Sequence, residues 1–279
     1  MNIFADLELA QRLERLEGSA CLSFVEARAR VHPDAKACWT KVAGAYAMFD
    51  EPTSPITQTF GLGMFEPATP SALDELEHFF LSRGATVNHE VSPLAGVELY
   101  ALLANRGYRP IELTSILYRE PANHLSGSVN ANIRVRIVST DEYRLWSDVS
   151  ARGWASDNQE LMDFLSGYGS VLAEKHDSVN FLAELDGLPI AAGSLSLSDG
   201  AALLAGASTI PEGRRHGAQF ALLDARLRYA ADHCCDLAMM GAAPGSTSQR
   251  NAERNGFKIA YTRVKWQLHP RTGTARTAP

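Results

Sequence analysis

The chain has 279 residues, of which 46% are hydrophobic, and its formal net charge at pH 7 is -6. The length exceeds that of one typical domain, and the apolar content is ample for a packed core. The acidic balance and the absence of a long basic run give a nucleic-acid-binding surface no support. No apolar run reaches the roughly 18 residues of a membrane-spanning helix, and the first residues lack the charged-then-apolar order of a signal peptide. We therefore expect a cytoplasmic protein of one large or two modest domains.

The first half of the chain predicts helices and strands in alternation. An amphipathic stripe in residues 4–16, ended by Gly18, indicates a first helix. The expected strands are residues 20–27, 37–49, 56–65, 86–91 and 111–119. The other expected helices are residues 70–81, opened by a proline, and residues 94–105, closed by Gly107.

A polar segment separates the two halves. Residues 122–132 contain three Asn, two Ser and Gly127, which is typical of a short exposed linker. The expected domains are therefore residues 1–121 and residues 133–269. The tail, residues 270–279, is rich in Thr and Arg, and we expect it to be disordered.

The second half predicts a longer series of elements. A helix is expected to begin near Thr140, and Leu161 and Leu172 belong to a further helical region. The dipeptide Asp186-Gly187 between two apolar runs predicts a tight hairpin. The expected strands are residues 133–138, 181–185, 189–197, 201–210 and 237–241, with a closing strand pair within residues 258–268. The later helices are expected at residues 220–231 and 248–255.

The segment between the strand at 201–210 and the helix at 220–231 predicts an anion site. Its sequence from Arg214 to Gln219 is Arg-Arg-His-Gly-Ala-Gln. A helix N-terminus favours anions, and a glycine lets the backbone approach them closely. The loop lacks the Gly-Lys-Ser/Thr ending of a P-loop and the glycine spacing of a Rossmann fold, which argues against a nucleotide-binding motif of either kind.

A short internal sequence similarity relates the two halves. The end of one helix, Ala-Asn-Arg-Gly-Tyr at residues 104–108, is similar to Glu-Arg-Asn-Gly-Phe at residues 253–257, about 150 residues later. Between its strand and its helix, however, the first half has Glu66 and two prolines instead of an arginine-glycine loop. These residues supply the wrong charge and fewer N–H donors for an anion. We expect only the second half to hold the ligand.

Residues 209–219, Thr-Ile-Pro-Glu-Gly-Arg-Arg-His-Gly-Ala-Gln, resemble the acetyl-CoA pyrophosphate loop of the GNAT acyltransferase superfamily. Arg214 and Gly217 match that loop, whereas Gln219 stands where a glycine or alanine is usual. The helix ending at Gly256-Phe257 also looks like the one in that superfamily. The resemblance implies an α/β fold of two tandem GNAT-like domains, each a mixed, mostly antiparallel twisted sheet flanked by helices, with a degenerate first copy.

The resemblance also implies where the cofactor binds. The strand before the loop would splay from the strand at 237–241, and acetyl-CoA, or another acyl-CoA, would lie between them. Backbone groups would bond the pantetheine amides, and the loop N–H groups would bond the pyrophosphate. The residues implied to bind the cofactor are Ala207, Ser208, Thr209, Arg214, Arg215, His216, Gly217, Ala218, Gln219, Ser248 and Asn251.

The catalytic residues have competing interpretations. Many GNAT proteins place a proton-donating tyrosine where this chain has Ala252, so Tyr261 is the nearest candidate acid, although a strand tyrosine is more often packing. Glu184 is a candidate base or a solvent-facing strand residue. Trp154 would contact the acceptor or pack in the core. Ser248 would bond the cofactor or only cap its helix.

Two classes of function follow from the resemblance. The first is an N-acetyltransferase that moves an acyl group from CoA to a small-molecule or peptide amine by direct attack. The alternative is a protein that binds acyl-CoA without turnover. We expect no nucleic-acid or membrane partner, and the first helix could contact a second subunit of a homodimer. The four cysteines, Cys21, Cys38, Cys234 and Cys235, lack zinc or redox spacing, so we expect no metal.

Overall fold

A computed structural model describes residues 3–122, 125, 127, 129–154 and 169–269. The first half contributes three helices and five strands to the described chain. The helices are α1 (Leu7–Val31), α2 (Pro70–Leu81) and α3 (Val97–Arg106). The strands are β1 (Cys38–Val42), β2 (Ala45–Phe49), β3 (Gln58–Phe60), β4 (Asn88–Val91) and β5 (Tyr108–Arg119).

The described second half begins with a strand and ends with one. Its helices are α4 (Tyr143–Trp154), α6 (Gly169–Ala173), α7 (Ala218–Asp232) and α8 (Thr247–Arg254). Its strands are β6 (Ile133–Ile137), β7 (Ser178–Leu185), β8 (Leu188–Ser198), β9 (Ala201–Thr209), β10 (Leu237–Ala242) and β11 (Lys258–Leu268). Short 3-10 helices cover Pro33–Ala35, Pro93–Ala95, Thr140–Glu142 and Pro211–Gly213. Leu161 and the tail at 270–279 lie outside the described residues.

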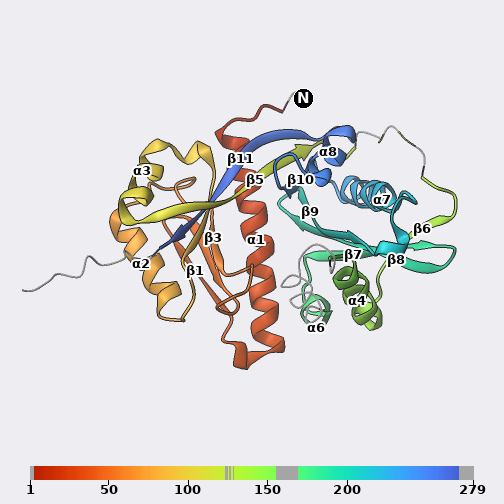
Figure 1. Cartoon of the computed structure of the whole chain (residues 1–279), viewed down its shortest axis with the longest axis horizontal. Helices are drawn as coiled ribbons and strands as arrows, with labels where there is room; N and C mark the ends of the chain where they lie inside the picture. Colours follow the sequence, from red (N-terminus) through yellow and green to blue (C-terminus); the bar gives the residue numbers. More distant parts are fainter. Residues whose placement is uncertain (1–2, 123–124, 126, 128, 155–168, 270–279) are drawn as a thin grey trace, which may run out of the picture.

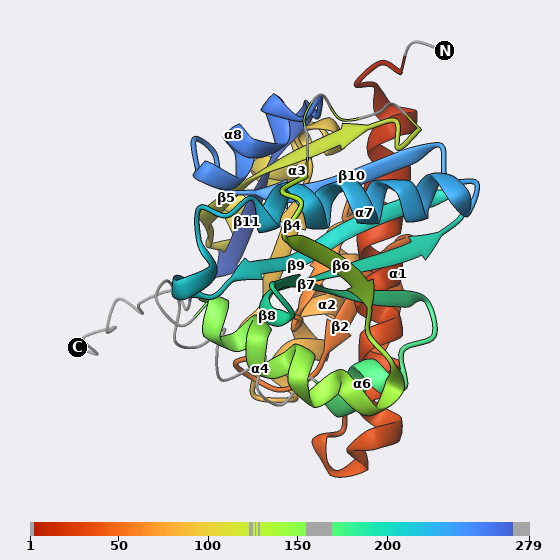
Figure 2. The same ribbon diagram turned by 90° about the vertical axis from the view of Figure 1, so that its right-hand side faces the viewer.

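All the strands join one 11-stranded sheet, in the order β1-β2-β3-β4-β11-β5-β10-β9-β8-β7-β6. The pairs β3–β4 and β9–β10 are parallel, and the other pairs are antiparallel. Helices α7 and α8 lie on one side of the second half's strands, and α4 and α6 lie on the other (Figures 1 and 2). The mixed α/β architecture expected from the sequence is confirmed.

The two halves exchange their last strands at the centre of the sheet. Strand β5, from the first half, pairs with β10, and β11, from the second half, pairs with β4. The two exchanged strands also pair with each other along their length, and they run side by side through the middle of the molecule (Figure 1). The closing strand pair expected within 258–268 is therefore wrong, because this segment is one strand whose partners come from the first half.

Helix α1 is much longer than expected and includes residues 20–27, for which a strand is wrong. Asp6 caps its start by accepting a hydrogen bond from the N–H of Leu9 at 2.9 Å. Gly18 lies inside the helix and does not end it. A Cβ at this position would lie 2.9 Å from Cδ2 of Tyr46 on β2. The glycine instead lets the helix approach the sheet, and α1 runs between the two halves (Figure 1).

Two tight turns connect neighbouring antiparallel strands, and the one at Asp186-Gly187 was expected from the sequence. Asp186 and Gly187 both have positive φ, 50° and 85°, as a tight hairpin between β7 and β8 requires. The strand expected over 37–49 is divided into β1 and β2 by a similar turn at Ala43 and Gly44. Among the described residues, no helix is long and apolar enough to cross a membrane.

Candidate functional site

The site begins where β9 and β10 separate. The two strands pair in parallel only from Ala201 to Leu203, which lie opposite Leu237 to Met239. Farther along, the register of β9 with β8 shifts between Ala192 and Ser194, at a bulge where Gly206 has a φ of +61°. After Leu203, the edge of β9 that faces β10 therefore has no strand partner among the described residues, while the other edge stays paired with β8. The splay expected between these strands is present.

A cavity of about 720 Å³ occupies the splay, within the range of about 300–1,000 Å³ that small-molecule sites span. It is bordered by the end of α4, the outer part of β9, the loop before α7, the first turns of α7, and α8. The described lining residues are Gly153, Trp154, Ala207, Ser208, Thr209, Gly213, Arg214, Arg215, Gly217, Ala218, Gln219, Phe220, Leu223, Arg226, Met240, Thr247, Ser248, Asn251, Ala252 and Asn255.

The loop before α7 presents backbone N–H groups to this cavity. Arg215 and Gly217 have φ values of 65° and 90°, a left-handed backbone that turns successive N–H groups to one side. The N–H groups of residues 215–219 have no acceptor in the described part of the chain. They stand at the positive end of the 15-residue α7, and a Cβ at Gly217 would meet nothing within 4 Å. N–H groups without acceptors at a helix N-terminus are suited to bind an anion.

Gln219, the departure from the GNAT loop pattern, holds the loop to the sheet. Its Nε2 donates to Oγ1 of Thr209 at 2.8 Å. Arg214 Nε also donates to the carbonyl of Thr209, at 3.4 Å. The side chain of Gln219 therefore connects the first turn of α7 with the end of β9.

Helix α8 supplies the opposite wall. Ser246 caps this helix by accepting from the N–H of Gln249 at 3.1 Å, so the cap expected at Ser248 lies two residues earlier. Ser248 and Asn251 line the cavity, as does the methyl group of Ala252.

The end of α4 closes the cavity from the other face of the sheet. Gly153 permits close packing there, since a Cβ would lie 2.4 Å from Oγ of Ser208. That hydroxyl donates to the carbonyl of Ser150 at 3.0 Å. Trp154 lines the cavity, and its buried Nε1 has no hydrogen-bond acceptor among the described residues. An indole donor without an acceptor is available to a ligand.

His216 is the one implied cofactor-binding residue that is not among the described cavity-lining residues. Its carbonyl accepts a hydrogen bond from Nδ2 of Asn130 at 3.1 Å, which ties the loop to the segment before β6. The other implied residues, from Ala207 to Asn251, are brought together around one space.

Tyr261 lies in a buried charge cluster away from the cavity. Its hydroxyl donates to Oε1 of Glu14 at 2.8 Å, and Arg263 contacts the same carboxylate. Arg263 also pairs with Glu90 on β4 at 2.9 Å. Burial, and then the Glu14 charge, raise the pKa of Tyr261 well above its usual value. This cluster connects α1, β4 and β11.

Glu184 likewise faces an arginine and not the cavity. Its Oε1 accepts from Nε of Arg136 at 2.6 Å, while the two Nη atoms of Arg136 donate to Glu142. These bonds join β6, β7 and the turn before α4. The acid and base roles of Tyr261 and Glu184 stay predictions from the sequence, and the cavity lining does not include either residue.

Arg226 is a charged cavity residue that sequence reasoning missed. It lies on the face of α7 that packs against the sheet, one turn after Leu222, and only 4% of its surface is exposed. Its presence in an apolar helical stripe was the available signal, because arginine is seldom buried without a partner. Burial lowers the pKa of its guanidinium to about 10, so it is still charged at neutral pH.

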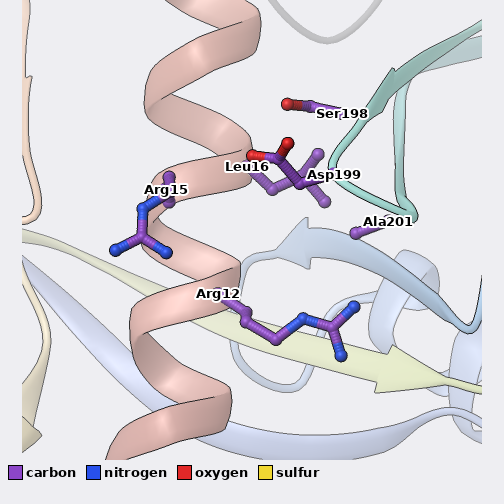
Figure 3. A pocket seen from close by; sticks show the side chains of 6 residues that line it. All are labelled: Arg12, Arg15, Leu16, Ser198, Asp199 and Ala201. Atoms are coloured by element: carbon purple, nitrogen blue, oxygen red, sulfur yellow. The ribbon is translucent and has the colours of Figure 1, made fainter.

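A second hollow lies between α1 and the turn that joins β8 to β9 (Figure 3). Leu16 faces this turn, and the guanidinium groups of Arg12 and Arg15 diverge from each other (Figure 3). Its volume of about 30 Å³ has room for only a few water molecules. The cavity at the splay is therefore the candidate site.

No protein-family model matches the chain, and no curated protein sequence matches it significantly. Solved structures do. A GCN5-related N-acetyltransferase from Kribbella flavida has a TM-score of 0.62 at 18% identity, over 89% of this chain and 96% of that one. A conserved protein of unknown function from Staphylococcus epidermidis has a TM-score of 0.60 at 10% identity, over 84% of this chain and 94% of that one.

A tandem GNAT protein from the clavulanic acid biosynthesis pathway has a TM-score of 0.58 at 15% identity, over 82% of this chain and 80% of that one. These likenesses extend over both halves of the chain. The protein therefore has the tandem GNAT fold, and the resemblance drawn from the sequence is confirmed at the level of the fold.

Proposed function

We propose that this protein is an N-acyltransferase that takes an acyl group, most simply acetyl, from acyl-CoA and transfers it to an amine. The observation that carries the proposal is the open anion loop of residues 215–219 at the mouth of the splayed cavity. A pyrophosphate fits the loop N–H groups, and an extended arm with amides fits the unpaired edge of β9.

Direct attack of an amine on a thioester does not require a permanently bound cofactor or metal. The neutral amine attacks the thioester carbonyl, and the CoA thiolate leaves. Positioning both reactants in one cavity supplies much of the rate, and N–H donors aimed at the carbonyl oxygen supply more. The acceptor would enter beside Trp154, and we propose a small-molecule or peptide amine.

Cofactor binding is tested first, by titration calorimetry with acetyl-CoA. We expect binding that Gly217→Glu weakens at least tenfold, because the new side chain brings a negative charge into the anion loop. Gly187→Glu is the matched control: Gly187 has a similar φ, 85°, and equally open surroundings, but it lies in the β7–β8 turn. An equal loss in both variants, or no binding by the unaltered protein, would reject the proposed site.

Turnover is tested by release of free CoA thiol over a panel of amines. An amine that increases thiol release, with loss of the increase in Gly217→Glu, supports the acyltransferase. Tight binding of acetyl-CoA with no release across small amines and peptide N-termini would instead identify a protein that binds acyl-CoA without turnover.

A further inference from the structure

Arg226 places a buried positive charge in the cavity lining, away from the anion loop. It lies roughly two turns beyond Ala218 on α7, about 12 Å farther from the anion loop at the helical rise of about 1.5 Å per residue. Leu223, Met240 and Ala252 give the same lining apolar surface. The other charged side chains of the described lining, Arg214 and Arg215, belong to the loop at the mouth.

The Arg226 charge is only partly compensated by the protein. Nε donates to the carbonyl of Leu222 at 3.1 Å, and Nη1 donates to the carbonyls of Ser194 and Ala205 at 3.2 and 3.4 Å. Among the described residues no carboxylate pairs with this guanidinium, and its hydrogen bonds to the protein come from Nε and Nη1 alone, so Nη2 has no acceptor there. A buried cation without a counter-charge is unfavourable, so an anion that reaches Nη2 would be strongly stabilised.

Strand β8 makes room for this cation. A Cβ at residue 193 would lie 3.3 Å from both Cζ and Nη1 of Arg226, tighter than ordinary contact, so Gly193 allows the guanidinium to rest on the strand. Gly193 lies in the bulge that splays β9. The bulge between β8 and β9 therefore both opens the cavity and makes room for the Arg226 guanidinium.

The described cavity lining contains no Asp, Glu, His, Cys, Tyr or Lys. When the amine attacks, a C–N bond forms, the C–S bond breaks, its electron pair goes to sulfur, and the amine proton goes to water. The departing sulfur then carries a full negative charge, and none of these side chains is present in the described lining to protonate it. A fixed cation is the alternative means of stabilising that charge.

We propose that Arg226 binds the sulfur of CoA through Nη2 and stabilises it as the thiolate leaving group. This inference rests on the proposed function. A carboxylate on the acyl chain is the competing ligand, but bidentate pairing with a carboxylate needs two donors on one side of the guanidinium. Nε and Nη1 already donate to main-chain carbonyls, and the single free nitrogen, Nη2, suits a single anionic atom.

The test is a pH titration of CoA bound to the full-length protein, followed by the ultraviolet absorbance of the thiolate. The complex with dethio-CoA is subtracted, so the cysteines of the protein do not contribute. We expect the acid dissociation constant of the bound thiol to be at least tenfold larger than that of free CoA. Arg226→Met should remove this increase, and Arg226→Lys, which keeps the charge, should retain part of it.

Arg215→Met is the matched control, because it removes one charge at the mouth. It should weaken CoA binding and leave the thiol titration unchanged. Should Arg226→Met fail to fold, the unaltered protein still decides: CoA that binds with an ordinary thiol titration overturns this inference alone, whereas CoA that does not bind overturns the proposed function as well. Succinyl-CoA that binds at least tenfold more tightly than acetyl-CoA, through Arg226, would show that the cation reads an acyl carboxylate and would also overturn it.

Discussion

At the scale of single residues, the buried ionisable side chains decide how stability depends on pH. His89 on β4 is fully buried, and its Nε2 lies 3.1 Å from the hydroxyl of Tyr108. Its Nδ1 has no hydrogen-bond partner among the described residues. Burial lowers the pKa of His89 to about 3, so the folded protein keeps this imidazole neutral.

This neutrality predicts acid sensitivity. An unfolded histidine gains a proton below a pKa of about 6.5, whereas the folded His89 does not until about pH 3. Only the unfolded state takes up a proton between these values, so the free energy of unfolding falls as the pH falls, by up to about 1.4 kcal/mol per pH unit from this group. Above pH 6.5 the full stability is present.

Urea unfolding of the unaltered protein and of His89→Gln at pH 7 and pH 5 measures this effect. The loss between the two pH values should be smaller by about 2 kcal/mol in the variant. His78→Gln, at an exposed position on α2, serves as the control and should keep the original loss. Parallel profiles for all three proteins would refute the assignment.

At the scale of elements, Gly18 shows how one contact reverses an intrinsic preference. Replacing glycine by alanine inside a helix normally stabilises it by about 1 kcal/mol. In α1 the added methyl would meet the ring of Tyr46 at 2.9 Å. We expect Gly18→Ala to lower the melting temperature, measured by circular dichroism, instead of raising it.

Tyr46→Ala provides the companion measurement for this contact. In that background the ring is gone, so Gly18→Ala should become neutral or stabilising. A stabilising effect of Gly18→Ala in the unaltered protein would mean that the ring moves aside at little cost.

The elements that the sequence predicted well are those specified by neighbouring residues. Helix α2 has Pro70 in its first turn and a cap at Thr69, and the β7–β8 hairpin has Asp186-Gly187 at its turn. The conformation of the loop before α7 is likewise set by its own residues, among them Gly217 with a positive φ. By contrast, Gly18 was interpreted as a helix end, but it lies inside α1 and packs against Tyr46 on β2, a contact that neighbouring residues do not reveal.

The candidate site follows the same division. The loop from Arg214 to Gln219 could be predicted from its own sequence to present N–H groups before a helix, because backbone conformation there is a local property. Arg226 was missed because its place in the cavity depends on packing against Gly193, at a bulge of β8 that is far from it in sequence. Tyr261 was proposed as an acid from its nearness to α8 in sequence, but its hydroxyl is bonded to Glu14 on α1.

At the scale of the whole molecule, the two similar helix ends of the internal repeat lie just before the two strands that the halves exchange, β5 and β11. Gly107 and Gly256 both have positive φ, 97° and 81°, and follow helices α3 and α8. Each leads directly into an exchanged strand, β5 or β11. The similarity in the sequence therefore identified equivalent helix ends. It contained no information on which half each following strand joins, since strand pairing is not local.

The exchange predicts that neither half is stable alone. Without the second half, β4 loses β11, and without the first half, β10 loses β5. Each fragment would expose backbone N–H and C=O groups that are paired in the intact sheet, together with part of its core. The division at the linker, proposed from composition, would then separate two parts of one cooperative unit.

Expression of residues 1–122 and 129–279 as separate chains tests this expectation. Alone, each should aggregate or lack a cooperative thermal transition. Expressed together, with an affinity tag on one chain, they should co-purify and recover the acetyl-CoA binding and the single calorimetric transition expected of the intact protein. If residues 129–279 alone unfold cooperatively and bind acetyl-CoA, the second half closes its sheet without β5, and the exchange is not needed for folding. That outcome would also place the whole cofactor site in one half, whereas recovery only on co-expression would show that the central strands hold β10, and with it the splay, in place.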